Sequence, residues 1–573
     1  MRSVFRRGLR SALAAMAVAL GLSLAAASPA RAAGPTVTDL GPVEVVKRDN
    51  GLPADWQRKG VFIEILVRAY QDSNGDGIGD LNGVTERLDY LKALGISGIW
   101  LMPIFKSSDR DHGYAVVNYR EIEPDYGTLA DFDRLLAEAH QRGIGVIVDY
   151  VINHSSSDHP MFEDAYDHKD SIYADWYIFK DSPQKGWNTF SGDPWREAGQ
   201  RWYYAVFDTA MPDFNLRNPL VMDFHLNNLR FWLNRGVDGF RFDAVGVLIE
   251  NRAIAWENQP ENHTVMKRIH ALLDEYGKRY MVCEAPGDPA AFAAADSCGS
   301  AFAFGLQKHI IASIKLGRVK PDLLYTLSTQ PVARMATLLA NHDAFAGARL
   351  FKQFNGDEKS YRVAAATLLT LPGTPFIYYG EEIGLSHAEP VQQDDQAIRG
   401  PMSWSGQTQA GFSRGDKLFR PLVANWKTHN VEVQKGDPGS LLNQYRQLIE
   451  LRKSEPALSV GSFTPLAKKD EPIFAFTREH EGSKILVLIN YAYRDATLTL
   501  PAEFRPAQWK AVFPANGSWP SALKSSSGSA KAAPNPKGKK PAAQAAPASG
   551  GGGAGGPEIR MAPQQILIFK AVG

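Results

Sequence analysis

The chain has 573 residues, of which 44% are hydrophobic and 22% are charged, and its formal net charge is +1. These values are ordinary for a soluble globular protein and suffice for one large domain with smaller ones attached. A nearly neutral chain has no extended basic face for nucleic acid and no strongly acidic face. We therefore expect a neutral partner and no binding of nucleic acid.

The first 32 residues have the pattern of a secretory signal peptide. A basic start precedes an apolar run that ends in Ala30-Arg31-Ala32, an A-x-A cleavage signature. The run is too short for a confident membrane span, and no comparable run follows it. We predict cleavage after Ala32 and a secreted or periplasmic protein that is monomeric and free of the membrane. The only cysteines, Cys283 and Cys298, could form at most one disulfide in an oxidising compartment.

Short apolar strands alternate with amphipathic helical stretches through residues 53–455. Such alternation is typical of repeated βα units and a parallel sheet. Eight candidate strands predict an α/β fold, a (β/α)8 TIM barrel. The candidate strands cover residues 61–70, 98–104, 145–151, 239–245, 280–286, 300–306, 335–343 and 375–383.

Two further regions depart from this alternation. Residues 153–219, after the third strand, are rich in Trp, Tyr, Asp and His and predict a small inserted domain. Residues 456–573 change to short alternating segments, which predict a C-terminal antiparallel β-sandwich domain. Within it, residues 521–557 contain no aromatic and no acidic residue, so we predict a disordered insertion before the last strand. For this insertion a spacer role is favoured over a lysine-assisted binding role.

One strand, GVDGFRFDAV at residues 236–245, contains Asp238, Arg241 and Asp243 in an otherwise apolar stretch. Because burying an unpaired charge is costly, these residues form either an internal ion pair or part of a reaction site. In a (β/α)8 barrel the active site lies at the carboxyl ends of the strands. Polar residues close other strands as well: Asp149, Asn153, His154, Glu284, Asn341, His342 and Asp343. Their convergence on one rim favours a reaction site.

Four segments resemble, in order and spacing, the signature regions of the α-amylase family, glycoside hydrolase family 13. They are DYVINH (149–154), GFRFDAV (239–245), VCEAPG (282–287) and ANHD (340–343). GIWLMPI, MPDFN and GTPFIYYGEE resemble further segments of that family. The likeness is to secreted bacterial α-amylases, intermediate with the oligo-1,6-glucosidase branch. It implies the barrel fold and a glycosidase activity.

The resemblance implies a double-displacement mechanism. Asp243 would be the nucleophile, Glu284 the general acid and base, and Asp343 the third carboxylate, which holds sugar hydroxyls. A retaining glycosidase needs one ionised and one protonated carboxyl group, which agrees with this division. Arg241, two residues from Asp243, lies on the same strand face and can keep that aspartate ionised. Asp238 lies outside this arrangement, and we expect it only to cap the strand.

The resemblance also implies which residues hold the sugar in the cleaved subsite. His154 and His342 resemble the family's sugar-binding histidines, although for either one alone a structural role would be the simpler interpretation. In DHGY, Asp111 and Tyr114 resemble a hydroxyl-binding acid and a stacking platform. In IRGPMSW, Arg399 resembles a substrate contact of exo-acting relatives.

The segment DSNGDGIGD at residues 72–80 predicts a Ca²⁺ site. Acidic and amide side chains recur at alternate positions of a glycine-bent loop, a spacing of oxygen ligands that suits Ca²⁺. The segment also resembles a calcium loop of the oligosaccharide-cleaving branch of the family. The predicted ligand set is Asp72, Asn74, Asp76, Ile78 and Asp80. The alternative is a solvated turn of acidic residues.

The sequence favours a retaining glycosidase that cleaves α-1,4-glucosidic bonds in starch-type glucans or maltooligosaccharides, closest to an α-amylase. MPDFN supports this, because dedicated α-glucosidases of the family more often carry a glutamine where this chain has Met211. IRGPMSW favours the alternative, an exo-acting α-glucosidase or a trehalose synthase. A non-catalytic carbohydrate-binding or transporter-accessory relative is the remaining alternative, and the complete set of three carboxylates disfavours it.

Overall fold

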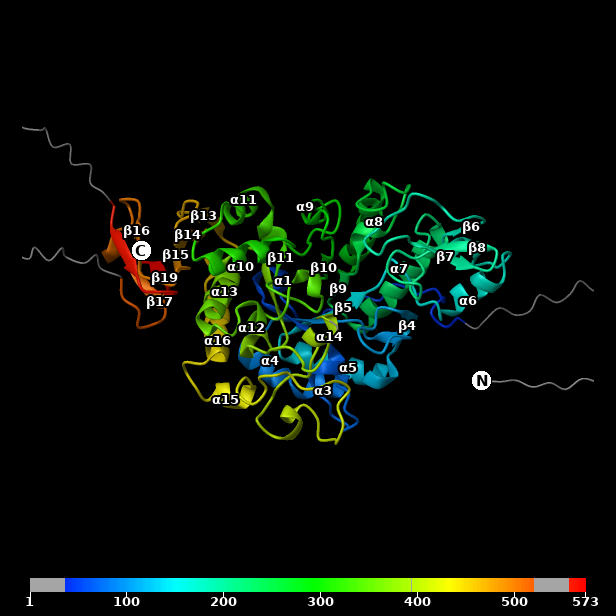
Figure 1. Ribbon diagram of the computed structural model, residues 1–573, viewed down its shortest axis with the longest axis horizontal. Coiled ribbons are helices and arrows are strands. Elements are labelled where there is room, and N and C mark those ends of the chain that lie inside the picture. Colours follow the sequence, from blue (N-terminus) through cyan, green and yellow to red (C-terminus); the bar gives the residue numbers. More distant parts are fainter. Residues whose placement is uncertain (1–36, 393, 520–555, 573) are drawn as a thin grey trace, which may run out of the picture. The chain divides into compact units, whose positions relative to one another are not determined.

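The computed structural model describes residues 37–392, 394–519 and 556–572, so the predicted signal peptide and most of the predicted insertion at 521–557 lie outside the described residues. Seven parallel strands pair in the order β10-β9-β5-β2-β1-β12-β11, and four of them, β5, β9, β10 and β11, are labelled in Figure 1. Their bounds are β1 (Phe62–Ile65), β2 (Gly98–Leu101), β5 (Gly145–Tyr150), β9 (Gly239–Phe242), β10 (Tyr280–Cys283), β11 (Ala336–Thr337) and β12 (Thr374–Tyr378).

Two isolated parallel bridges stand in place of a sixth strand. Cys283 at the end of β10 pairs with Ala301, and Phe302 pairs with Ala336 of β11. The expected strand 300–306 is thus reduced to two residues, yet these complete the ring of eight parallel positions. The expected strand 335–343 is also shorter, because the chain leaves the hydrogen-bonded ladder after Thr337. The fold is the (β/α)8 barrel that the sequence predicts.

The inward-facing side chains of the strands form two layers in the barrel interior, one apolar and one polar. The apolar layer includes Phe62, Trp100, Ile147, Val282, Phe302 and Phe376. The polar layer includes Glu64, Asp149 and Glu284, which are also buried. Each follows an apolar-layer residue by two positions along the chain. Because residues i and i+2 point to the same side of a strand, the charged groups lie at the carboxyl ends of the strands, above an apolar floor.

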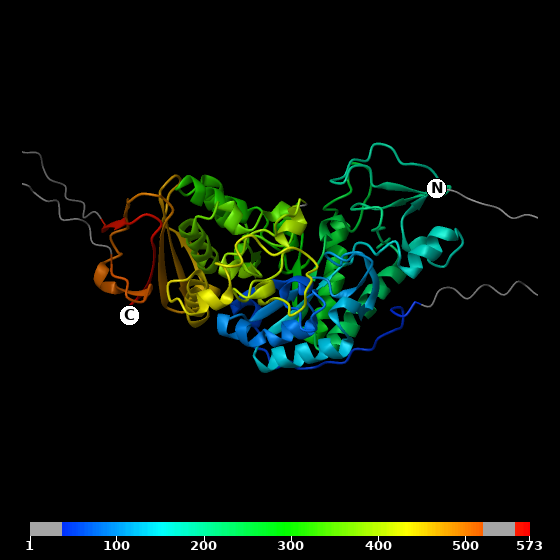
Figure 2. The ribbon, with the colours of Figure 1, turned by 60° about the horizontal axis from the view of Figure 1, so that its bottom comes forward.

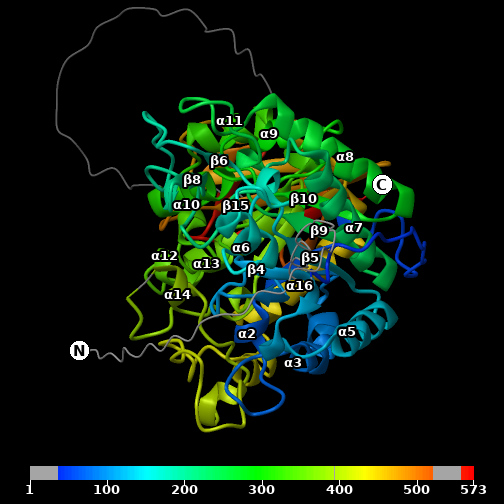
Figure 3. The same ribbon diagram turned by 90° about the vertical axis from the view of Figure 1, so that its right-hand side faces the viewer.

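Helices flank the strands, and Figure 3 shows α5, α7 and α8 beside β5, β9 and β10. Helix α5 begins with a capping box of Thr128 and Asp131, in which each residue satisfies an N–H group of the other. Helix α7 begins after Asn218 and ends before Gly236, whose φ of 110° favours glycine. The longer helices are α3 (Leu81–Glu86), α4 (Leu88–Leu94), α5 (Leu129–Gln141), α7 (Pro219–Arg235), α8 (Pro260–Tyr276), α10 (Leu306–Leu316), α11 (Pro321–Thr329), α13 (Glu358–Thr370) and α16 (Leu441–Ser454). The shorter ones are α1 (Trp56–Lys59), α2 (Val67–Tyr70), α9 (Pro289–Phe292), α12 (Leu350–Gln353), α14 (Asp394–Ile398), α15 (Val431–Lys435) and α17 (Pro456–Ser459).

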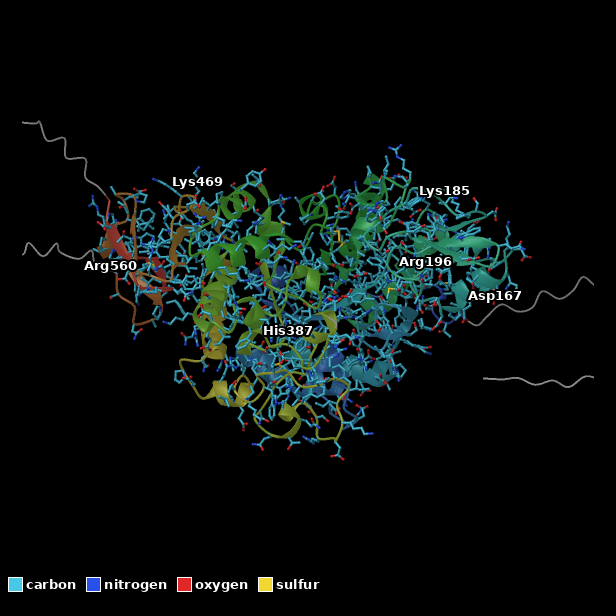
Figure 4. The ribbon with its side chains drawn as sticks, viewed as in Figure 1. Asp167, Lys185, Arg196, His387, Lys469 and Arg560 are labelled. Carbon is cyan, nitrogen blue, oxygen red and sulfur yellow. A yellow bond between two sulfur atoms is a disulfide. The ribbon has the colours of Figure 1, made fainter. Side chains whose placement is uncertain are left out.

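A small domain is inserted between β5 and α7, as the sequence predicts. It contains helix α6 (Pro160–Asp167) and a three-stranded sheet, drawn in teal in Figure 2. The sheet has the order β6-β8-β7, with β6 (Phe179–Lys180), β7 (Trp195–Ala198) and β8 (Arg201–Tyr204). Asp167 and Lys185 are exposed on this domain (Figure 4). A hairpin that the sequence analysis did not predict, β3 (Phe105–Ser107) and β4 (Val116–Ile122), carries the DHGY segment in its turn.

The C-terminal region forms the predicted antiparallel β domain. Its five-stranded sheet has the order β13-β14-β15-β19-β17, and a two-stranded sheet pairs β16 with β18. Their bounds are β13 (Ser462–Pro465), β14 (Ile473–His480), β15 (Ser483–Asn490), β16 (Ala496–Thr499), β17 (Trp509–Phe513), β18 (Glu558–Met561) and β19 (Ile566–Ala571). Buried Arg478 of β14 donates to the carbonyl oxygen of Thr370, the last residue of α13, over 2.7 Å. In the described ranges, no helix is both long enough and apolar enough to cross a bilayer.

Candidate active site

Arg241 of β9 lies at the centre of a buried cluster of carboxylates. Its Nη1 donates to Asp149 Oδ1 over 2.9 Å and to Asp243 Oδ1 over 2.6 Å. Its Nη2 lies 2.8 Å from Glu284 Oε2. All four side chains are largely shielded from solvent. One guanidinium thus faces three carboxyl groups, which is more negative charge than a simple internal ion pair contains.

Burial raises the pKa values of the two predicted catalytic carboxyl groups. The pKa of Asp243 is raised to about 6, because burial outweighs the opposing effect of Arg241. The pKa of Glu284 is raised to about 7, again by burial against Arg241, with added repulsion from Asp243 and Asp343. Near neutral pH the more perturbed Glu284 can hold a proton while Asp243 is ionised. This is the asymmetry that a nucleophile and a general acid require.

His342 connects the third predicted carboxylate to the barrel interior. Its Nδ1 donates to Glu64 Oε1 over 2.6 Å, and its Nε2 lies 3.0 Å from Asp343 Oδ2. Burial alone would lower the pKa of His342, but the charges of Asp343 and Glu64 raise it to about 10. Burial would conversely raise the pKa of Asp343, and the His342 imidazolium and Arg399 hold it well below its usual value. Asp343 is therefore ionised and can accept hydrogen bonds.

Tyr114 and His154 border the same space from outside the barrel strands. The Tyr114 hydroxyl donates to Asp149 Oδ2 over 2.9 Å, and its ring stacks on His342 with 5.6 Å between the centroids. His154 is buried, and its Nε2 has no hydrogen-bond partner among the described residues. Burial lowers the pKa of His154 to about 3, so its ring is neutral. Such a ring can exchange a hydrogen bond with a sugar hydroxyl.

Asp111 and Arg399 form an ion pair on one side of this space. Arg399 Nη1 donates to Asp111 Oδ2 over 2.9 Å, and Arg399 Nη2 donates to Asp343 Oδ1 over 3.1 Å. Burial would raise the pKa of Asp111, but Arg399 and Arg420 hold it below its usual value. Arg420, which the sequence analysis missed, donates from Nη2 to Asp111 Oδ1. No motif in the sequence singled it out.

These side chains surround a cavity of about 880 Å³. Seven of the nine residues predicted for catalysis and substrate binding line it: Asp111, Tyr114, His154, Asp243, Glu284, Asp343 and Arg399. The other two, Arg241 and His342, hydrogen-bond to lining residues and are themselves buried. Apolar side chains of Phe207, Met211 and Phe345 line it as well. A pocket with an apolar wall and converging carboxylates fits a sugar ring, which has apolar faces and a hydroxyl rim.

The family model described as alpha amylase, catalytic domain, matches residues 64–461. The chain belongs to the α-amylase family, glycoside hydrolase family 13. A trehalose synthase/amylase of Mycolicibacterium smegmatis is 34% identical over 75% of this chain and 82% of its own length. An oligo-1,6-glucosidase of Halalkalibacterium halodurans is 30% identical over 79% of this chain and 93% of its own. The solved structure of an α-glucosyl transfer enzyme matches with a TM-score of 0.75 at 29% identity, covering 90% of this chain and 99% of that one. The chain is thus a glycoside hydrolase or transglycosylase of the oligo-1,6-glucosidase branch of this family.

Two residues outside the nine predicted for catalysis and substrate binding are hydrogen-bonded to this family 13 centre. Asp149 accepts hydrogen bonds from Arg241, Tyr114 and Trp100 Nε1, the last over 3.1 Å. Glu64 accepts from His342 and is buried at an inward position of β1. A lone acid in the apolar strand VFIEI was the signal that could have identified Glu64, because such a residue needs a buried partner.

Cys283 and Cys298 form a disulfide, which settles the alternative that the sequence left open. Cys283 is the last residue of β10, and Glu284 follows it directly. The two cysteines are 15 residues apart, with 6.2 Å between their Cα atoms. The bridge therefore ties the segment after α9 to the strand end that precedes Glu284.

The predicted calcium loop at residues 72–80 is held by its own side chains. Asp72 Oδ1 accepts from the Asn74 amide over 3.0 Å, Asn74 Oδ1 from the Asp76 amide over 2.8 Å, and Asp76 Oδ1 from the Ile78 amide over 2.8 Å. Asp80 caps α3 by accepting from the Gly83 amide over 2.8 Å. These successive turns curl the loop. Each Asp72 oxygen accepts two hydrogen bonds, whereas Asn74 Oδ1 and Asp76 Oδ1 accept one each and keep a lone pair. The oxygen donor set fits a hard cation. Among the described residues, no three His, Cys, Asp or Glu side chains converge as a metal cluster.

Asp238 does more than cap its strand. Its Oδ2 accepts from the Val146 amide over 2.8 Å and lies 2.7 Å from His140 Nε2. Its Oδ1 accepts from the Asn50 side-chain amide. This fully buried carboxylate therefore joins β9 to β5, to α5 and to the segment before α1. The local sequence could not show this, because its partners lie far away along the chain.

Proposed function

We propose that the protein is an exo-acting α-glucosidase or α-glucosyltransferase that removes one terminal glucosyl unit from an α-glucan, a maltooligosaccharide or an α-linked disaccharide. The ion pair of Arg399 with Asp111 carries this proposal. Arg399 also contacts Asp343, so one guanidinium joins two cavity-lining carboxylates and closes one side of the cavity. A sugar chain that continued past this side would have to break buried, charge-assisted hydrogen bonds.

The mechanism follows from the protonation states. Asp243 attacks the anomeric carbon and forms a glycosyl-enzyme, while Glu284 donates its proton to the leaving oxygen. Glu284, now a carboxylate, then removes a proton from water or from an acceptor hydroxyl, which attacks the same carbon from the same face. Arg241 stays hydrogen-bonded to Asp243 and stabilises the returning carboxylate. The leaving group would lie against the apolar side, near Phe207, Met211 and Phe345.

An endo-acting α-amylase is the second candidate, favoured by Met211 of MPDFN, which lines the cavity. The two candidates differ in their need for a free non-reducing end. We expect the protein to release glucose from maltose or p-nitrophenyl α-glucoside and to leave untouched a p-nitrophenyl maltoheptaoside blocked at its non-reducing end. Rapid cleavage of the blocked substrate would favour the endo-acting candidate. Product analysis on maltose, trehalose and sucrose would separate hydrolysis from glucosyl transfer.

We also propose that Ca²⁺ binds the loop 72–80 and stabilises the native state. Binding to the folded state alone raises the apparent melting temperature. Asp76→Ala should remove the stabilisation by added Ca²⁺, whereas the matched change Asp274→Ala, at a carboxylate of α8 whose side chain is 77% exposed, should preserve it. A wild-type melting temperature that changes with neither added Ca²⁺ nor chelator would contradict this proposal.

Export by cleavage after Ala32 remains part of the proposal. The disulfide supports it, because such bonds persist in oxidising compartments. N-terminal sequencing of protein recovered from the periplasm or the medium tests the cleavage site, and a mature chain that begins at Met1 would contradict it. A monomeric state is proposed on the sequence alone, and light scattering of the purified protein tests it.

A further inference from the structure

Arg420 is a buried arginine that reaches the active site from outside the family's signature segments. Its Nη2 donates to Asp111 Oδ1, and its Nη1 donates to the carbonyl oxygen of Arg399 over 3.2 Å. Only 9% of the residue is exposed. Because Arg399 holds Asp111 Oδ2, each carboxylate oxygen of Asp111 receives a different guanidinium. The closed side of the cavity therefore has two arginines, of which Arg420 is the outer one.

A second cavity, of about 560 Å³, has this arginine in its lining. Arg420 lines it, together with residues 418–419 and 421–424 and with Glu389, Gln409 and Trp426. Asp111 lines the catalytic cavity and is absent from the lining of the second one. Arg420 thus lines the second cavity and is paired with a residue that lines the catalytic one.

The segment that carries Arg420 is anchored on both sides. The Phe419 amide donates to the carbonyl oxygen of Gly77 over 3.0 Å, and Ser413 Oγ donates to Asp72 Oδ2 over 2.6 Å. On the other side, the Glu389 amide donates to the carbonyl oxygen of Leu422 over 3.3 Å. These bonds hold the main chain on both sides of Arg420, so substitution of its side chain should open a passage without moving the segment.

We propose that Arg420 is a specificity-determining residue that separates the glucosyl pocket from a latent subsite for further glucosyl units. The inference rests on the proposed exo-action. The second cavity offers an aromatic ring in Trp426 and hydrogen-bonding groups in Glu389 and Gln409, which suit a neutral pyranose ring. With Arg420 in place, the Asp111 carboxylate is fixed, and the bound sugar chain must end in the glucosyl pocket. Without it, Arg399 alone holds Asp111. The singly held Asp111 side chain can then turn aside and let a sugar chain continue into the second cavity.

The test compares Arg420→Ala and Arg420→Lys with Lys417→Ala, a control at an exposed position of the same segment. The substrates are p-nitrophenyl α-glucoside and the end-blocked p-nitrophenyl maltoheptaoside. Arg420→Ala should raise KM for the glucoside about tenfold and change kcat less than about twofold, because the loss is of ground-state positioning. It should also cleave the blocked substrate at least about tenfold faster than the wild type. For Arg420→Lys, KM for the glucoside and the rate on the blocked substrate should lie between the values of the wild type and of Arg420→Ala. Lys417→Ala should match the wild type in both.

The outcomes separate this inference from the proposed function. A wild type that is inactive on the glucoside, or that cleaves the blocked substrate rapidly, overturns the proposed exo-action. A wild type that behaves as proposed, with an Arg420→Ala variant of unchanged KM and no gain on the blocked substrate, overturns the role of Arg420. Equal losses of kcat on both substrates with a lowered melting temperature also overturn it, because they indicate a structural role. If Arg420→Ala does not fold, Arg420→Gln is judged by the same criteria.

Discussion

The two ends of strand β9 hold buried carboxylates in opposite conditions. At the amino end, the single Asp238 carboxylate has three neighbours that can donate, from Val146, His140 and Asn50. At the carboxyl end, the single Arg241 serves Asp149, Asp243 and Glu284. A buried carboxylate whose oxygens all receive hydrogen bonds stabilises the fold. Several carboxyl groups that share one cation retain perturbed pKa values, and such groups are suited to catalysis.

The largest effect should come from removing the proposed nucleophile. Asp243→Ala cannot form the glycosyl-enzyme, and turnover of every α-glucoside should fall by about four powers of ten or more. Its free energy of unfolding should change little, because Arg241 keeps Asp149 and Glu284 as partners. Steady-state kinetics and denaturant unfolding measure the two effects. A stable variant with near-wild-type turnover would show that Asp243 is not the nucleophile.

Glu284→Gln should separate the two catalytic roles. The nucleophile remains, so an activated glucosyl fluoride should still label the enzyme, but no general base is left to activate water for the second step. The labelled intermediate should accumulate, and mass spectrometry should find the sugar on the peptide that contains Asp243. A label on any other residue would refute the assignment of the nucleophile.

The opposite effect should follow at the amino end of β9. Asp238→Ala removes an acceptor and leaves the buried Val146 amide without a partner, which should cost about 3 kcal/mol of unfolding free energy. The kcat of the folded fraction should stay within about twofold of the wild type, because Asp238 does not line the cavity. Asp274→Asn, at a carboxylate whose side chain is 77% exposed, is the control and should change stability little. Loss of kcat without loss of stability would contradict the structural role.

A smaller effect should appear in the dependence on pH. The pKa values predict kcat/KM that rises through about pH 6, as Asp243 ionises, and falls through about pH 7, as Glu284 loses its proton. The pKa of Glu284 is raised from 4.5 in the unfolded chain to about 7 in the fold, so its contribution to stability is full below pH 4.5 and is lost as the pH rises to about 7. Glu284→Gln should flatten that loss. Identical pH profiles of stability for the wild type and this variant would show that Glu284 is not perturbed.

The order of the strands and the chemistry of the rim could be predicted from the sequence, because both depend on local patterns. Alternation within GFRFDAV places Arg241 and Asp243 on one face, and the barrel topology brings every strand end to the same rim. The strand at 300–306 could not be bounded in this way, because only its neighbours β10 and β11 determine which residues pair. The hairpin β3–β4 was missed because its pairing has register shifts that break the alternation.

The residue types and their spacing along the chain by themselves determined the fold, the family and the three carboxylates, since these features repeat with the period of a strand or recur as short motifs. Only the tertiary structure decided the partners of isolated charges. Asp238 is 98 residues from His140, Asp111 is 309 residues from Arg420, and Glu64 is 278 residues from His342. A buried charge requires a partner, but the sequence does not say which of many distant residues will supply it. That choice depends on the packing of the whole barrel, and it distinguishes a structural carboxylate from a catalytic one.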